Sequence, residues 1–171
     1  MNLEIFNAKQ TSLTDADVRS IVEIECHPKV RKWLTEYIGD NIEKEFRDYR
    51  RFFRHLPKNT RVNVLIAKMD GKIVGFLALR RLGISMEHVG SIGISVHPDH
   101  WGKGIAIHLI ESAIELAKEK GLKRLEIETL AENTAMRHAA EKLGFILEGI
   151  RKNRIHKDGT YHDEAAYFLL I

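Results

Sequence analysis

The stretch HPDHWGKGIA, residues 97–106, joins two segments of different pattern and places a glycine on either side of a lysine. The residues before it, SIGISV (91–96), alternate between apolar and small side chains, as a strand does. The residues after it, 105–120, carry apolar side chains at helical spacing. A glycine turn that leads into a helix N-terminus offers free backbone N–H groups to an anion. The stretch therefore predicts a phosphate or pyrophosphate site, although a glycine-rich turn without a ligand has the same pattern.

Neither common nucleotide-binding motif is present at this turn. A Walker A loop requires GxxxxGK[ST], and the sequence contains no such run. A Rossmann fingerprint requires GxGxxG directly after the first strand. Here Gly102-Lys103-Gly104 lacks the third glycine and follows several expected strands. The turn by itself leaves open which anion it binds.

The rest of the chain predicts an α+β (mixed α/β) fold in one domain, residues 1–171. Asp70-Gly71 and Asp158-Gly159 each separate two runs of strand-forming residues, which is typical of hairpins. We expect a twisted, mostly antiparallel sheet of about seven strands, flanked by about four helices. The expected strands are 3–9, 62–69, 72–81, 91–96, 122–130, 145–156 and 160–171, and the expected helices begin near Thr14, Pro28 (a short one), Asp40 with Glu43 as its capping partner, Ile105 and Asn133.

The composition is that of a globular protein with a mild positive charge. Of 171 residues, 44% are hydrophobic and 30% are charged, and the formal net charge is +3. No window approaches the roughly 18–20 apolar residues of a membrane span, and the N-terminus lacks a signal-peptide layout, so we expect a cytoplasmic protein with no membrane partner. Cys26 is the only cysteine, and no metal is expected from the nine histidines. Frequent Lys and Glu with rare Gln favour a thermophile source.

One cluster of positive charge stands out in the expected helix after Asp40. Its arginines recur at the spacing of one helix face, with Glu43 four residues before the first of them. Such a charged face is more often solvated than bound to a partner, so nucleic acid is not an expected partner. A nucleic-acid-binding domain stays the least favoured alternative. The arginines are Arg47, Arg50, Arg51 and Arg54.

Two segments, GISVHPDHWGKGIAIHLIESAIELA (93–117) and NTAMRHAAEKLGF (133–145), together resemble the GCN5-related N-acetyltransferase (GNAT) family. That family has a strand, a glycine loop and a helix, followed by an Asn-capped helix that ends in E-K-x-G-F. The resemblance covers residues 62–171 well, whereas residues 1–61 match only in general layout. It implies a GNAT fold and an enzyme that transfers acetyl directly from acetyl-CoA to a primary amine. The ending DGTYHDEAAYFLL (158–170) resembles members that acetylate small amines, amino acids or protein N-termini.

The resemblance also implies where acetyl-CoA would lie. Its pantetheine arm would run along the strand backbone, like an added half-strand. Asn133 would either reach the cofactor or simply cap its helix. Residues 62–171 would form the acetyl-CoA-binding core and residues 1–61 the acceptor side. Trp33, Tyr37 and Phe53 either line the acceptor pocket or belong to the core. A homodimer is a possible assembly. The implied cofactor contacts are Ile94, Ser95 and Val96 for the arm, and Trp101, Gly102, Lys103, Gly104, Ile105 and Ala106 for the pyrophosphate.

The catalytic groups are less well marked. The resemblance implies that a backbone N–H near Val96 stabilises the negative charge that develops on the acetyl oxygen. Ala140 replaces a tyrosine that many members use as an acid, and Ser91 replaces a common glutamate. Glu87 and His88, just before the strand, are the candidates for accepting the proton of the amine. The two missing groups leave a non-catalytic acetyl-CoA-binding regulator as the alternative function.

Overall fold

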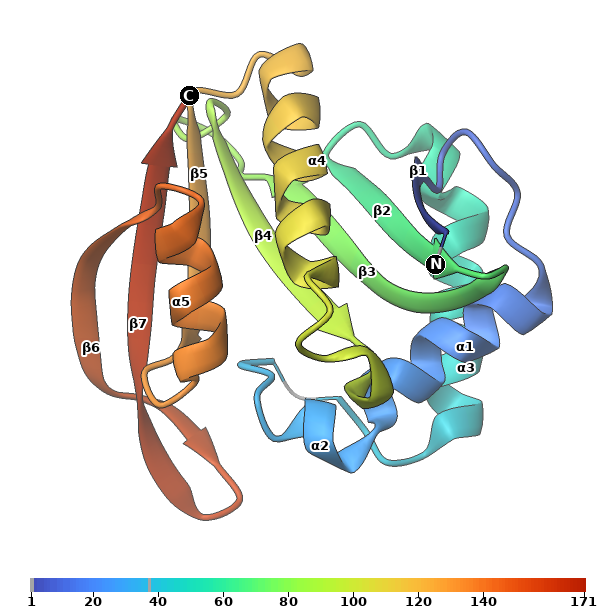
Figure 1. Cartoon of the computed structure of the whole chain (residues 1–171), viewed down its shortest axis with the longest axis horizontal. Coiled ribbons are helices and arrows are strands. Elements are labelled where there is room, and N and C mark those ends of the chain that lie inside the picture. The colour runs from blue at the N-terminus through green and yellow to red at the C-terminus, as the bar shows by residue number, and fades with distance from the viewer. Residues whose placement is uncertain (1, 37) are drawn as a thin grey trace.

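The computed structural model of the chain describes residues 2–36 and 38–171 and consists of one seven-stranded sheet with helices on both faces (Figure 1). The strand order is β1-β2-β3-β4-β5-β7-β6, and every neighbouring pair is antiparallel except β4 and β5. The elements are β1 (Leu3–Asn7), α1 (Asp15–Cys26), α2 (Pro28–Arg31), α3 (Ile42–His55), β2 (Val62–Met69), β3 (Lys72–Arg81), β4 (Val89–Val96), α4 (Ile105–Glu119), β5 (Arg124–Leu130), α5 (Thr134–Lys142), β6 (Ile146–Lys157) and β7 (Thr160–Leu170), with short 3₁₀ turns at Leu56–Lys58 and Pro98–His100.

This arrangement confirms the expected mixed, mostly antiparallel fold of about seven strands. Five α-helices lie in the described residues and begin near the five expected positions, and the shortest of them is the four-residue helix at Pro28. The start of α3 differs from expectation by one residue. Asn41, not Asp40, caps the helix, and its side chain accepts from the N–H of Lys44 at 3.0 Å. Glu43 is not a capping partner, because its carboxylate pairs with Arg19 at 2.8 Å.

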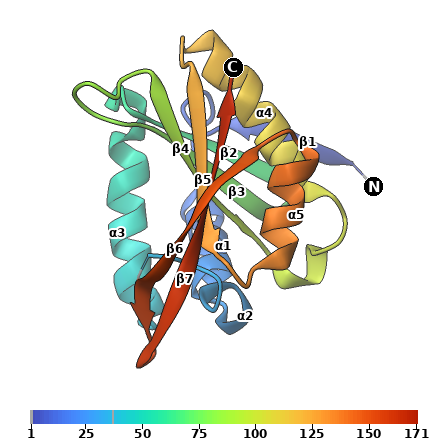
Figure 2. The same ribbon diagram turned by 90° about the vertical axis from the view of Figure 1, so that its left-hand side faces the viewer.

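The sheet, which Figure 2 shows close to edge-on, separates two hydrophobic cores. Helices α4 and α5 cover one face, where Leu77, Leu109 and Leu125 are fully buried. Helices α1 and α3 lie on the opposite face, over a smaller core that includes Ile21 and Ile66. Helix α3 contributes no buried residue to that core, although several of its aromatic side chains are half-buried. A helix held this loosely leaves space between itself and the sheet.

The neighbouring strands β4 and β5 separate part of the way along the sheet (Figure 1). Strand β4 pairs with β3 over residues 90–96, but it pairs with β5 only from Val89 to Ile92. Beyond Ile127, β5 continues as the partner of β7 alone. The last four residues of β4, Gly93–Val96, are therefore paired on one side only.

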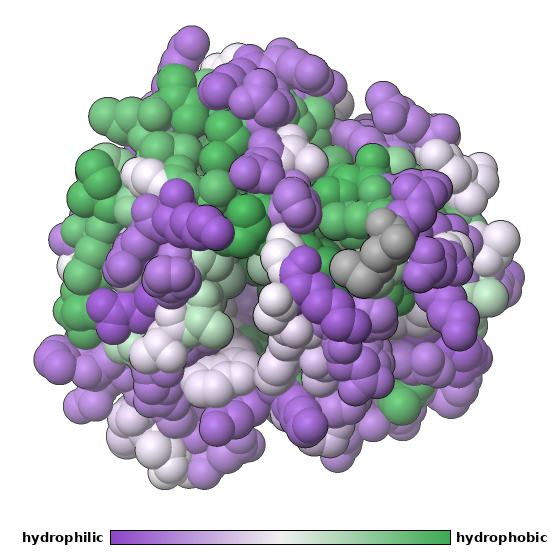
Figure 3. Space-filling model, in the orientation of Figure 1, coloured by the Kyte–Doolittle hydropathy of each residue, from purple (hydrophilic) through white to green (hydrophobic). Residues whose placement is uncertain are grey.

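The surface is mixed in character on the face seen in Figure 1. Hydrophilic residues cover much of this face, and apolar residues gather along the edge where β6 lies (Figure 3). Ile146, Leu147 and Ile150 of β6 are exposed there. None of the helices in the described residues has the length and apolar character needed to traverse a lipid bilayer.

Candidate active site

The glycine loop between β4 and α4 has the backbone geometry that the sequence predicts. Gly102 and Gly104 have φ values of +74° and +78°, in the left-handed region that favours glycine. Gly104 is also the N-cap of α4 and supplies no side-chain cap. An added Cβ at Gly102 would meet no atom within 4 Å, and one at Gly104 would meet only the ring of His108, at 3.9–4.0 Å. The loop is therefore open on the side where a ligand would approach.

Six consecutive backbone N–H groups at this loop have no acceptor among the described residues. The first bond that closes the helix runs from the N–H of His108 to the carbonyl of Gly104, at 3.1 Å. The N–H groups of residues 102–107 donate to no protein acceptor within 2–36 and 38–171. With the dipole of a 15-residue helix behind them and Lys103 beside them, they form a site for an anion.

The backbone of β4 alternates between its two neighbours, as in any antiparallel pair. At one end the N–H of His97 donates to Val74 at 2.8 Å, and at the other the N–H of Leu82 donates to Val89 at 2.9 Å. Odd-numbered residues of β4 therefore direct their backbone groups toward β3. Ser95 is one of them, so its backbone N–H belongs to the sheet, and its side chain lies on the face of α1 and α3.

The even-numbered residues of β4 direct their backbone groups the other way, toward β5. Ile92 is the last of them that pairs with β5. Ile94 and Val96 therefore present their backbone N–H groups to the gap between β4 and β5. The carbonyl of Val96 already has a partner, because the indole N–H of Trp101 donates to it at 2.8 Å. This hydrogen bond ties the glycine loop to the end of β4, which gives Trp101 a role that its sequence position does not reveal.

Replacing Trp101 with phenylalanine tests this tie. An aromatic ring is kept, although it is smaller than the indole, and one hydrogen bond is lost, which corresponds to about 0.5–1.5 kcal/mol. We expect acetyl-CoA to bind about 3- to 10-fold more weakly in W101F, with a small fall in the melting temperature. Calorimetric titration of acetyl-CoA measures the affinity, and W33F, which changes a tryptophan outside the glycine loop and β4, is the control. Equal affinity in W101F and the wild type would contradict a role for the tie.

A cavity of about 350 Å³ lies on the opposite face of the sheet and reaches the same part of β4. Its floor is formed by the small side chains of β4 and by neighbouring residues of β3, and its walls by α1, α3, residues 34–36 and Ile38. Glu128 of β5 also lines it, so the cavity extends to the gap between β4 and β5. The residues that line this cavity include Glu25, Glu36, Asp48, Phe53, Arg80, Ser91, Gly93, Ile94, Ser95 and Glu128.

Glu25 is a residue of this cavity that is not among the site residues predicted from the sequence. It lies in the last turns of α1, and its Oε2 atom is buried with no hydrogen-bond partner in the described residues. Burial raises the pKa of Glu25 to about 7, and the nearby carboxylates of Glu36 and Glu45 raise it further, whereas the Arg80 guanidinium opposes the rise. In the sequence, Glu25 follows Val18, Ile21 and Val22 at the spacing of the apolar face of α1, and a carboxylate on that face is the signal that marks it.

The structure does not bring the two predicted proton acceptors to the cavity. Glu87 and His88 are exposed in the loop before β4, and Glu87 pairs with Arg61 at 3.3 Å. Val96 lies eight residues beyond His88, which is about 26 Å along a strand at roughly 3.3 Å per residue. Both residues lie at the end of β4 where it is still paired with β5, so their role as proton acceptors stays a prediction that this geometry does not favour.

The remaining predicted residues have defined structural positions. Asn133 caps α5, and its side chain accepts from the N–H of Met136 at 3.2 Å, as expected of an N-cap. Ala140 is fully buried in the core and offers no proton donor. Phe53 lines the cavity, whereas Trp33 is not among its lining residues, and Tyr37 lies outside the described residues.

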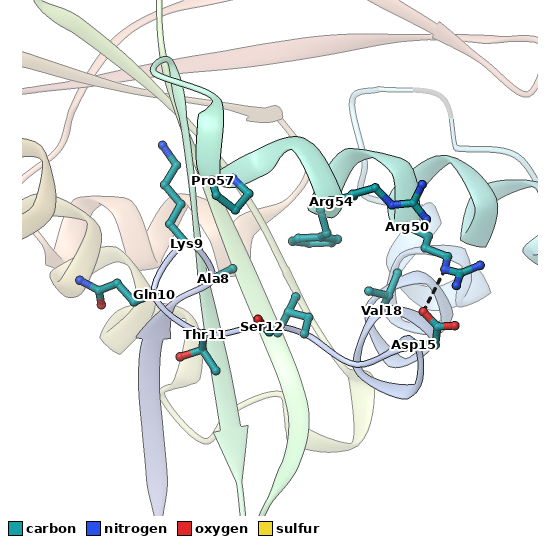
Figure 4. Close-up of a pocket in the computed structure, with 12 residues that line it drawn as sticks. Ala8, Lys9, Gln10, Thr11, Ser12, Asp15, Val18, Arg50, Arg54 and Pro57 are labelled. Carbon is teal, nitrogen blue, oxygen red and sulfur yellow. Dashed lines mark ion pairs between the residues drawn. The ribbon is translucent and has the colours of Figure 1, made fainter.

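A second cavity, of about 420 Å³, lies between the β1–α1 loop and the C-terminal half of α3 (Figure 4). Arg50 and Arg54 of α3 reach over it, and Arg50 pairs with Asp15 at 3.0 Å. Its lining includes no residue of β4 or of the glycine loop. The arginine cluster of α3 is exposed, and Arg51 is paired with Asp48 at 2.8 Å, which agrees with a solvated, partly paired face.

Within residues 2–36 and 38–171, no three His, Cys, Asp or Glu side chains gather in a way that could hold a metal ion. The glycine loop, the gap in the sheet and the cavity together suit a protein that holds an extended, anionic ligand beside a split sheet. Comparisons with known proteins identify the family.

A sequence model of the acetyltransferase (GNAT) family matches residues 22–145. An uncharacterised N-acetyltransferase of Archaeoglobus fulgidus is 33% identical over 104 residues, which is 57% of this chain and 71% of the relative. The crystal structure of an N-acetyltransferase from Staphylococcus aureus Mu50 superposes with a TM-score of 0.80 at 21% identity, over 99% of both chains. The structure of yncA from Salmonella typhimurium with its cofactor acetyl-CoA superposes with a TM-score of 0.77 at 20% identity, over 98% of this chain and 93% of that one.

The chain therefore belongs to the acetyltransferase (GNAT) family. It is an acetyl-CoA-dependent N-acetyltransferase, which moves an acetyl group from acetyl-CoA to an amine. Family membership favours this enzyme over the non-catalytic acetyl-CoA-binding regulator.

Proposed function

We propose that acetyl-CoA lies across the gap between β4 and β5, with its pyrophosphate on the N–H groups of residues 102–107. The observation that carries this proposal is the run of six unpartnered N–H groups at a helix N-terminus, which an anion would satisfy. Lys103, Ile105 and Ala106 belong to this contact through their backbone or charge, whereas Trp101 supports it through its hydrogen bond to Val96. Asn133 stays a further candidate contact, in addition to its capping role.

We propose that the pantetheine arm follows the unpaired edge of β4. Ile94 and Val96 direct free backbone N–H groups into the gap, as an edge strand does toward an added strand. Ser95 would contribute through its side chain and not through its backbone. The thioester supplies an activated acetyl group, and the N–H of Val96 would stabilise the negative charge on its oxygen.

We propose that the 350 Å³ cavity receives the acceptor amine. It opens onto Ile94 at the same stretch of β4, so the acceptor and the donor would meet at the gap from opposite faces of the sheet. In this arrangement residues 1–61 supply most of the acceptor walls, and residues 62–171 supply the acetyl-CoA core. Because both substrates are held at once, the transfer needs no covalent enzyme intermediate.

Comparing acetyl-CoA with S-acetylpantetheine, which lacks the pyrophosphate and nucleotide, tests the loop assignment without a mutation. Loss of two charge-assisted hydrogen bonds at about 1.5 kcal/mol each corresponds to roughly 100-fold in affinity. We expect S-acetylpantetheine to bind at least about 100-fold more weakly by calorimetry. Equal affinities of the two thioesters would contradict the assignment of residues 102–107.

A cytoplasmic location, a heat-adapted source and a homodimer stay predictions. Light scattering at defined protein concentrations decides the oligomeric state.

A further inference from the structure

The proposed acceptor cavity holds one carboxylate that its surroundings do not explain. The Oε2 atom of Glu25 is buried on the cavity wall, and no donor among the described residues reaches it. Buried carboxylate oxygens normally accept hydrogen bonds, because leaving one unpaired is costly. Glu25 is also one of the residues that line the cavity, so a molecule that enters the cavity can reach this carboxylate and supply the missing donor.

The other carboxylates of the cavity are already engaged or exposed. Glu128 is paired with Arg151, and Asp48 is paired with Arg51. Glu36 is 74% exposed and lies 3.9 Å from Arg80. Glu25 is therefore the buried carboxylate of this cavity that is free to take up a proton.

The charged groups around Glu25 influence the pH range in which its carboxyl group loses its proton. Arg80 of β3 favours the carboxylate, whereas Glu36, which precedes α3, and Glu45 of α3 disfavour it. Burial outweighs all of these and brings the pKa of Glu25 to about 7. A group with a pKa near the working pH can both accept a proton from the amine and release it to water.

We propose that Glu25 is the general base of the acetyl transfer and takes the first proton from the ammonium form of the acceptor. This inference rests on the proposed function, since it requires the cavity to be the acceptor site. The carboxylate accepts one ammonium proton, which leaves a neutral amine with its lone pair free. As the N–C bond forms and the C–S bond of the thioester breaks, the second proton of the nitrogen passes to the CoA sulfur. Glu25 then releases its proton to water.

Replacing Glu25 with glutamine tests the inference. The matched control is E23Q, which changes an exposed glutamate of the same helix. The assay follows release of the CoA thiol with three probes: an amino acid, a diamine and a short peptide with a free N-terminus. We expect kcat/KM of E25Q to fall about 100-fold at pH 7. The deficit should shrink as the pH rises toward the pKa of the amine, because more of the amine is then already neutral. The affinity for acetyl-CoA should stay unchanged, and E23Q should match the wild type.

A second measurement needs no substrate. The pKa of Glu25 is raised on folding, so the folded state holds its proton more tightly than the unfolded state. The contribution of this proton to the free energy of unfolding is fully present below the pKa that Glu25 has in the unfolded chain. It is lost as the pH rises toward the folded-state pKa of about 7. We therefore expect the melting temperature of the wild type, relative to E25Q, to fall between about pH 4.5 and pH 7. E23Q should show no such trend relative to the wild type.

Wild-type kcat/KM and pH dependence in E25Q would overturn the role of Glu25, and so would a melting temperature difference that does not change with pH. These outcomes leave the cavity testable on its own through G93V, a variant that obstructs the floor of the cavity. If G93V abolishes use of the amine while E25Q does not, the acceptor site stands and only the base assignment fails. If neither variant affects the amine, the proposed acceptor site fails as well.

Discussion

Acetyl-CoA is expected to bind G104V about 100-fold more weakly than the wild type. Gly104 has φ of +78°, where a β-branched residue is strained by roughly 1–3 kcal/mol. The strained backbone at residue 104 would change its conformation. The backbone N–H groups of residues 102–107 would then no longer point toward one common anion. Losing two charge-assisted hydrogen bonds of about 1.5 kcal/mol each gives roughly this factor. Calorimetric titration with acetyl-CoA measures the change.

Gly121 provides a matched control for this substitution. It follows the other end of α4 with φ of +73°, and an added Cβ would meet no atom within 4 Å. G121V should therefore lose similar stability through the same backbone strain, but it should bind acetyl-CoA like the wild type. If both variants bind equally well, or if both lose binding equally, the effect of G104V does not arise from an anion at the loop.

Amine use is expected to fail in G93V while acetyl-CoA binding is kept. Gly93 lies on the floor of the cavity, and an added Cβ would meet only the guanidinium of Arg80, at 3.8 Å. Valine is favoured in strands, so the fold should tolerate it. Its methyl groups would project into the proposed acceptor site, where a misplacement of about 1 Å can reduce a rate 100-fold. We expect kcat/KM for the amine to fall about 10- to 100-fold.

G149V is the control for G93V. Gly149 is also a strand glycine, in β6, and an added Cβ there would meet no atom within 4 Å. It should retain both acetyl-CoA affinity and amine kinetics. Normal amine kinetics in a folded G93V would contradict the placement of the acceptor. Together, G104V and G93V are expected to separate donor binding from acceptor use.

The loop and the elements around it could be predicted because their signals are local. Glycines with left-handed φ, a helix beginning at Ile105 and the alternation of β4 all depend on residues near in sequence. The Asn133 cap follows the same logic, because its hydrogen bond reaches only three residues ahead. The cap of α3 shows the limit of such patterns, since Asn41 and Asp40 are both good caps and only the backbone selects between them.

The residues that line the proposed acceptor cavity could not be predicted as a group, because they depend on the topology. Glu87 and His88 are next to β4 in the sequence, but they precede its paired end. Glu25 is far from β4 in the sequence and reaches the cavity only because α1 packs across that face of the sheet. The tie between Trp101 and Val96 likewise needs the loop to fold back on its strand. No local signal marks the Trp101 contact, whereas the position of Glu25 on the apolar face of α1 is a local signal of burial that does not reveal the cavity.

A crystal structure with acetyl-CoA bound tests the central claim most directly. The account predicts pyrophosphate oxygens at hydrogen-bond distance, about 2.7–3.2 Å, from several backbone nitrogens of residues 102–107. It also predicts the thioester oxygen facing the N–H of Val96, with the acetyl carbon open to the cavity that contains Glu25. A pyrophosphate bound away from this loop, or an acetyl group separated from the cavity by β4, would contradict it.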